Sequence, residues 1–127
     1  MFRRMFALFA VLGLAILPAA AQVQRHFPAD ALRGALLIEN APEVTLNGVP
    51  ARLAPGARIR GQNNMLAMSG TLAGQRLLVH YTLDANGHLR DIWILTPEEA
   101  ARRPWPATPQ EAANWVFDSG AQTWTRR

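Results

Sequence analysis

Hydrophobic and polar residues alternate most clearly between Arg76 and Thr96, and this stretch predicts a β-hairpin. Two runs rich in Leu, Val, Ile, Tyr and Trp flank the tetrapeptide DANG at 84–87. Gly87 can adopt the left-handed conformation that closes a three-residue loop with a bulge. The rest of the predicted fold is arranged around this hairpin.

The loop length predicts which residues of the hairpin face one another. It places Leu83 opposite Leu89 and Tyr81 opposite Asp91. Because side chains alternate between the two faces of a strand, one face is predicted to be the core. Its members are Leu77, Val79, Tyr81, Leu83, Leu89, Trp93 and Leu95.

Shorter strands are predicted before this hairpin, and they indicate a mainly β domain. Strand-like runs occur at 34–39, 43–46, 49–53, 58–60 and 65–71. The Asn47-Gly48 turn should pair Glu43 with Arg52, and the Pro55-Gly56 pair is typical of a type II turn. No helix-sized segment separates the strands, so we expect a small antiparallel meander. Closing it into an OB-like or SH3-like barrel would hide its edges.

The C-terminal quarter predicts two short helices and a Trp-rich tail. Thr96 and Thr108 are each followed by Pro and, three residues after the Thr, by Glu, which is the pattern of a capping box. The tail at 115–125 predicts either a last hairpin, packed through Trp115, Phe117 and Trp124, or a longer second helix. The Trp residues are predicted to fasten this segment over one barrel opening.

The N-terminus predicts an exported protein. A charged start, an apolar run from Met5 to Leu17 and small residues up to Ala21 are typical of a cleaved signal peptide. The apolar run is shorter than the roughly 20 residues that span a bilayer. We therefore predict a signal peptide at 1–21, a loose arm with one helical turn at 22–33, the β-domain at 34–96 and the helices and tail at 97–127. The predicted location is periplasmic or secreted, without stable membrane insertion after cleavage.

Composition excludes several kinds of site. The 127-residue chain has no Cys, which excludes disulfides, thiol catalysis and Cys-based metal sites. His80 and His88 are predicted on opposite strands, about 13 Å apart at the usual strand rise, so they should not share a metal ion. His80 is predicted to be half-exposed. Ser69 and Ser119 lie in no nucleophile motif, and no Gly-rich phosphate loop occurs, so no cofactor is predicted.

Two groups of residues are candidates for binding. Arg58, Arg60, Arg76 and Arg90 fall on or beside strands and would suit an anionic partner. The predicted Tyr81–Asp91 pair could instead form a polar site at the barrel mouth. With few excess cations and no aromatic RNA-binding motif, the sequence argues against a nucleic-acid partner.

Three segments resemble a group of small exported proteins of Gram-negative, β-proteobacterial type. They are LNGVPARLAPGARIRG, NNMLAMSG and DIWILTPEEAA, and the resemblance covers most of 33–125. It implies a periplasmic setting and assigns no activity or site residue.

Together these patterns favour a non-enzymatic periplasmic binding or accessory module for an envelope protein, a peptide or an anionic glycan. One alternative is a small cell-wall-directed hydrolase or lyase that uses Asp91 and Tyr81 as acid and base. Another is a structural partner subunit. Fold alone does not choose among these functions.

Overall fold

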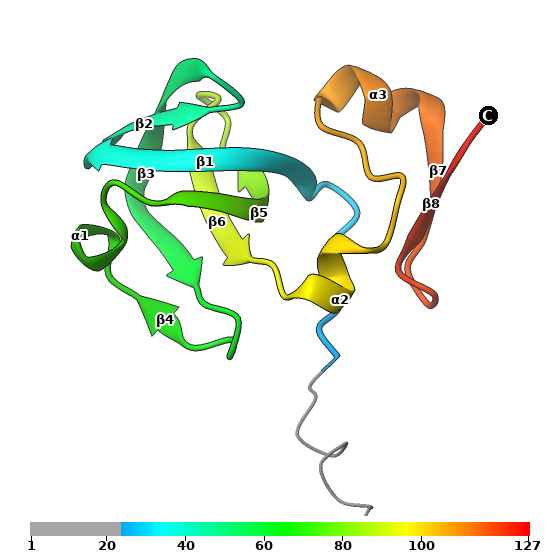
Figure 1. Cartoon of the computed structure of the whole chain (residues 1–127). Coiled ribbons are helices and arrows are strands. Elements are labelled where there is room, and N and C mark those ends of the chain that lie inside the picture. Colours follow the sequence, from blue (N-terminus) through cyan, green and yellow to red (C-terminus); the bar gives the residue numbers. More distant parts are fainter. Residues whose placement is uncertain (1–23) are drawn as a thin grey trace, which may run out of the picture.

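The computed structural model describes residues 24–127 and is mainly β (Figure 1). The predicted signal peptide at 1–21 lies outside the described residues. The strands are β1 (Leu32–Asn40), β2 (Glu43–Leu46), β3 (Val49–Arg60), β4 (Leu66–Ala67), β5 (Arg76–Leu83), β6 (Leu89–Ile94), β7 (Trp115–Asp118) and β8 (Thr123–Arg126). The helices are α1 (Ser69–Leu72), α2 (Pro97–Ala100) and α3 (Pro109–Asn114).

Five strands form a closed ring. The larger sheet has the order β2-β1-β5-β6-β3-β4, and β2 also pairs with β3. The prediction of an antiparallel meander is wrong for one pair of neighbouring strands, because β3 and β6 run parallel. Parallel neighbours need a long crossover, and residues 61–88, which include β4, α1 and β5, supply it. A crossover built mainly of strand and turn leaves no helical signal in the sequence.

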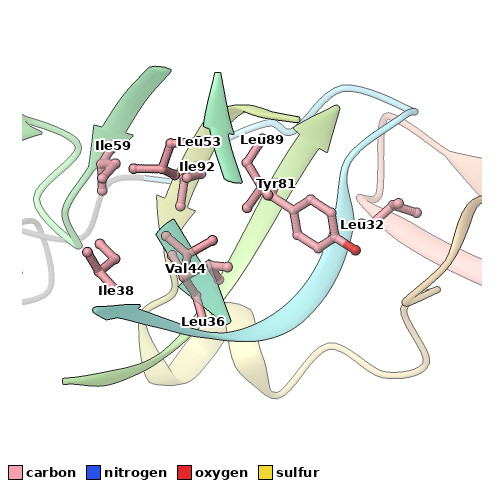
Figure 2. Packing of buried hydrophobic residues seen from close by; sticks show 10 residues of the cluster. Leu32, Leu36, Ile38, Val44, Leu53, Ile59, Tyr81, Leu89 and Ile92 are labelled. Atoms are coloured by element: carbon pink, nitrogen blue, oxygen red, sulfur yellow. The ribbon is translucent and has the colours of Figure 1, made fainter. Parts of the chain in front are cut away.

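The ring encloses a hydrophobic core (Figure 2). Its buried members are Leu32, Leu36, Ile38, Val44, Leu53, Ile59, Val79, Tyr81, Leu89 and Ile92. They come from all five strands of the ring, and along β1 and β5 they follow the alternation of a strand. The core of this domain is therefore the interior of the ring.

The Asn47-Gly48 turn is confirmed, together with the predicted pairing of Glu43 with Arg52, whose side chains form an ion pair. Asn47 and Gly48 both have positive φ, 54° and 81°. Such values are strained for residues with a Cβ and are characteristic of this hairpin turn.

Gly48→Ala should therefore lower the free energy of unfolding by about 1 kcal/mol. A Cβ at Gly48 would meet no atom within 4 Å, so the expected loss comes from backbone conformation alone. Gly70→Ala is the matched control, because Gly70 lies in α1 with equally open space and without positive φ. Urea unfolding measures both; an equal response of the two variants would contradict this explanation.

Two predicted local features are wrong, the first because β3 contains a bulge and the second because a short helix replaces most of the strand. Pro55-Gly56 does not separate two strands; it lies within β3, where the register with β6 shifts between Leu53 and Arg58. The strand predicted at 65–71 is reduced to β4, and the chain then enters α1. In both places the Gly and Pro signals mark an irregularity of the backbone.

A second cluster lies outside the ring. Phe27, Ala31, Leu95, Trp105 and Trp124 are buried together, and Trp93, Trp115 and Phe117 pack against them. The tail forms the β7–β8 hairpin, as one of the two predictions had it, with Phe117 opposite Trp124. Figure 1 shows this C-terminal segment, in orange and red, beside the ring. The Trp residues therefore fasten the tail to the domain.

The N-terminal arm is also part of this second cluster, which corrects the prediction of a loose segment. Arg25 and Phe27 are buried. The Phe27 backbone N–H donates to Gln122 Oε1 at 2.8 Å, and Gln122 Nε2 donates to the Phe27 carbonyl at 3.3 Å. The helical turn predicted in the arm is a simple turn, closed by the Ala31 N–H to the Pro28 carbonyl.

Candidate functional site

The predicted Tyr81–Asp91 pair does not form. Leu83 does face Leu89, but Tyr81 is paired with Ile92, because a bulge places two residues opposite Thr82. The Asp91 N–H and Thr82 Oγ1 lie 3.3 Å apart at this bulge. One extra residue moves every later side chain of β6 to the other face, so Ile92 is in the core and Trp93 faces outward.

Tyr81 is a structural residue of the ring interior. It is 3% exposed, and its hydroxyl donates to the Ala107 carbonyl at 3.1 Å. Burial raises its pKa above the ordinary value. Figure 2 shows the aromatic side chain of Tyr81 pointing toward Leu32, at one end of the core. This hydroxyl ties the C-terminal segment to the ring.

The four arginines that were predicted to bind an anion do not form one patch. Arg58 lies beside Asp91 in the β3–β6 register, and Arg90 Nε is 3.4 Å from Asp91 Oδ2. Arg60 lies beside Trp93 on the same pair of strands. Arg76 is at the start of β5, paired with β1. The structure thus brings Arg58, Arg90 and Asp91 together and leaves Arg76 apart from them.

A different polar group surrounds His80 on the outer face of the ring. His80 is 1% exposed, which corrects the prediction of a half-exposed residue. It stacks on Trp105 with a centroid distance of 4.1 Å and meets the edge of Phe27 at 4.4 Å. Arg33, its partner in the β1–β5 pairing, donates from Nε to His80 Nε2 at 3.2 Å. The Nδ1 atom therefore carries the proton of the neutral ring.

Arg33 also holds the chain that follows α2. Its guanidinium donates to the carbonyls of Glu99 at 2.9 Å, Ala100 at 3.2 Å and Arg102 at 2.9 Å. These carbonyls lie at the C-terminal end of α2, where a cation is favourable. Arg33 thus orders the segment that leads to Trp105, and its guanidinium carbon is 5.4 Å from the Trp105 ring centroid.

A buried ion pair lies next to this cluster. Arg25 donates from Nε to Glu99 Oε2 at 2.8 Å and from Nη2 to Glu99 Oε1 at 2.5 Å. The same guanidinium donates to the carbonyls of Gly61 and Ile94. Burial alone would raise the pKa of Glu99, but the hydrogen bonds from Arg25 and Thr96 lower it overall. Glu99 also completes the predicted capping box with Thr96.

The surface above these residues is a groove of about 590 Å³. Its lining consists of Arg33, Arg103, Pro104, Trp105, Ala107, Glu111, Trp115 and Arg126. The half-buried Trp115 provides aromatic surface, and the Arg126 guanidinium carbon lies 5.0 Å from its ring centroid, whereas Trp105 is only 7% exposed. The groove therefore combines flat apolar surface with three guanidinium groups.

The electrostatics of the groove are strongly positive. Burial lowers the pKa of Arg33 to about 10, and the nearby charge of Arg103 contributes next. Burial likewise lowers the pKa of His80 to about 2, with further contributions from Arg33, Arg25 and Arg102. The one carboxylate of the lining, Glu111, accepts a hydrogen bond from the Ala107 N–H at 2.8 Å. An anion entering the groove would meet cations with little internal neutralisation.

The arrangement offers binding groups rather than a set of metal ligands. Across residues 24–127, no three His, Cys, Asp or Glu side chains are grouped so that they could hold a metal ion. Arg103 and Arg126 are exposed and take part in none of the four ion pairs among the described residues. Their guanidinium groups are thus available to a ligand.

Sequence reasoning missed this groove because its parts come from distant segments. The local signal that could have found it is the Arg-Arg-Pro-Trp run at 102–105. Comparisons of the chain with protein-family models, with curated proteins and with solved structures find no match.

Proposed function

We propose that the protein is a non-enzymatic periplasmic binding module that holds an anionic glycan in the groove lined by Arg33, Arg103 and Arg126. The observation that carries the proposal is three guanidinium groups beside two Trp rings, with Glu111 as the one opposing carboxylate. Guanidinium groups bind carboxylate, sulfate and phosphate through paired hydrogen bonds. The half-buried Trp115 ring offers a flat surface for the apolar face of a sugar ring.

The three arginines of the groove differ in their contacts, and this difference supports the assignment. Arg33 already makes four hydrogen bonds within the chain and so contributes charge and position. Arg103 and Arg126 are exposed and would make the direct contacts. The bound anion would then replace water around two groups that are held near the aromatic walls.

We also infer that the ring is a small barrel of OB-like form. The closed strand order, the parallel β3–β6 pair and the short helix α1 between β3 and β5 support this form over an SH3-like one. OB-like barrels bind many kinds of ligand. The choice of ligand therefore rests on the groove and not on the fold.

Titration with hexagalacturonate, which has one carboxylate on each sugar ring, tests the proposed ligand class. We expect saturable binding that weakens as NaCl rises from about 50 to 500 mM, because salt screens exposed charges. The readouts are calorimetry and quenching of Trp fluorescence. Neutral maltohexaose of equal length should not bind. Equal binding of hexaglutamate would show that the groove binds polyanions in general, which would contradict the assignment of a glycan ligand.

Arg103→Ala with Arg126→Ala should weaken hexagalacturonate binding by about tenfold for each lost guanidinium. The matched control is Arg58→Ala with Arg60→Ala and Arg90→Ala, which removes three of the four arginines favoured by the sequence and should leave affinity unchanged. If this control loses binding while the first variant keeps it, the ligand lies on the β3–β6 face. No binding by the unmodified protein would reject the proposed function.

A further inference from the structure

Three large apolar side chains are exposed together at the β4 end of the molecule. The exposed fractions are 67% for Met65, 66% for Leu66 and 74% for Met68. Single exposed apolar residues are common on protein surfaces, but a group of this size indicates contact with something apolar. None of the three side chains contributes to the two hydrophobic clusters of residues 24–127.

The backbone presents this group in a fixed form. The Asn64 N–H donates to the Gly61 carbonyl at 2.9 Å, and the Gly61 N–H donates to the Met65 carbonyl at 2.9 Å. The Met65 N–H donates to Asn63 Oδ1 at 3.0 Å. A tight, hydrogen-bonded turn followed by the two-residue strand β4 therefore supports the exposed side chains.

An apolar groove of about 540 Å³ adjoins the group. Its lining includes Pro42, Leu53, Ile59, Leu66 and Met68. Arg58 is the one charged residue of this lining. Apolar surface and a guanidinium group thus lie side by side, and Leu66 and Met68 belong to both the groove and the exposed group.

Arg58 and Arg60 lie at this surface, in a stretch of the sequence without carboxylates. Between Glu43 and Asp84 the chain has four arginines and no Asp or Glu. Arg60 pairs with Leu66 across β3 and β4, so the two side chains share a face. The carboxylate nearest to Arg58 by register, Asp91, is already in contact with Arg90.

We propose that Met65, Leu66 and Met68, flanked by Arg58 and Arg60, dock on the surface of an anionic phospholipid bilayer. The apolar tips enter the boundary between headgroups and acyl chains, and the guanidinium groups meet lipid phosphates. This contact is peripheral: within residues 24–127, no helix is long and apolar enough to cross a membrane. The surface is separate from the Arg103–Arg126 groove, so the inference goes beyond the proposed function.

Cosedimentation with vesicles tests the inference. The protein is purified as the cell produces it, and mass spectrometry confirms the same N-terminus in every preparation. We expect binding to vesicles of phosphatidylglycerol and phosphatidylcholine, and at least tenfold weaker binding to phosphatidylcholine alone. Met65→Ser with Leu66→Ser and Met68→Ser should reduce partitioning at least tenfold, and Arg58→Ala or Arg60→Ala about fivefold each.

Matched controls keep the test specific. Val49→Ser with Val116→Ser removes two other exposed apolar residues and should not change partitioning. Arg103→Ala with Arg126→Ala should not change it either; loss of binding in this variant would assign the lipid to the proposed glycan groove. Equal binding of the triple-Ser variant and the unmodified protein would overturn the inference, as would a failure of the unmodified protein to bind anionic vesicles.

A single label gives a second readout. Because the chain has no Cys, Met65→Cys allows one environment-sensitive dye to be attached at this site. Its emission should shift to shorter wavelength with anionic vesicles, while a dye on Val116→Cys should not respond. A shift that depends on protein concentration without lipid would identify a second copy of the chain as the occupant and overturn the membrane assignment.

Discussion

Replacing Glu99 with Ala should lower the free energy of unfolding by about 3–5 kcal/mol, because it leaves the buried Arg25 charge without its carboxylate. The side chains of Arg25 and Glu99 are 5% and 6% exposed. The remaining Arg25 partners, the Gly61 and Ile94 carbonyls, do not carry a compensating charge. The same change removes the bond from the Thr96 N–H to Glu99 Oε1 at 2.9 Å. Urea or thermal unfolding measures the loss.

Glu98→Ala is the control for this prediction, because Glu98 is the exposed neighbour in the same first turn of α2. It should change stability by less than about 0.5 kcal/mol. The double variant Arg25→Met with Glu99→Leu should be more stable than Glu99→Ala, because apolar replacement of both partners leaves no buried charge. If Glu99→Ala is as stable as Glu98→Ala, the ion pair does not hold the N-terminal arm.

Acidification from pH 7.5 to 5 should cost about 2 kcal/mol of stability through His80 alone. Burial lowers the pKa of folded His80 to about 2, whereas an unfolded His titrates near 6.5. Between these values the unfolded state binds a proton that the folded state does not. The contribution is therefore fully present above pH 6.5 and is lost as the pH falls below it.

His80→Asn should remove this slope above pH 5, although it should also lower stability at every pH by weakening the stack on Trp105. The slope is measured above pH 5 because, despite burial, the hydrogen bonds from Arg25 and Thr96 lower the pKa of Glu99 below its ordinary value, away from this range. His26→Gln, which removes an exposed imidazole, should retain the slope. The measurement is the free energy of unfolding at half-unit pH intervals. If the dependence of stability on pH is the same in His80→Asn as in the unmodified protein, His80 is not its source.

Local sequence signals predicted several turns and one of the two capping boxes. At Thr108 the side chain accepts from the Glu111 N–H, but Glu111 Oε1 accepts from the Ala107 N–H and does not complete the box. The Asn47-Gly48 hairpin, the loop at 84–87 and the Thr96 capping box all depend on a few adjacent residues with defined backbone preferences. The β7–β8 hairpin was one of two open readings, and Trp124 decides it by packing against Phe117. Where neighbours in sequence determine the conformation, the sequence was sufficient.

The predicted register of β6 and the predicted binding site were wrong because both depend on contacts that have no local sequence pattern. The bulge opposite Thr82 inserts one residue without any turn signal, and that single residue separated Asp91 from Tyr81. His80 was expected to be half-exposed because the sequence of β5 gives no sign of the residues that cover it. These are Phe27, which precedes the ring, and Trp105, which follows it. Arg25 and Glu99 are 74 residues apart. Such contacts are fixed by packing and have no local pattern.

The bonds between the N-terminal arm and the C-terminal segment set the order in which the chain can finish folding. Ribosomes release the N-terminus first, yet Phe27 finds its partner only when Gln122 has been made. The second cluster therefore cannot close on a growing chain. The ring core, whose buried residues lie between Leu32 and Ile92, does not depend on Gln122 and can therefore form before the second cluster closes.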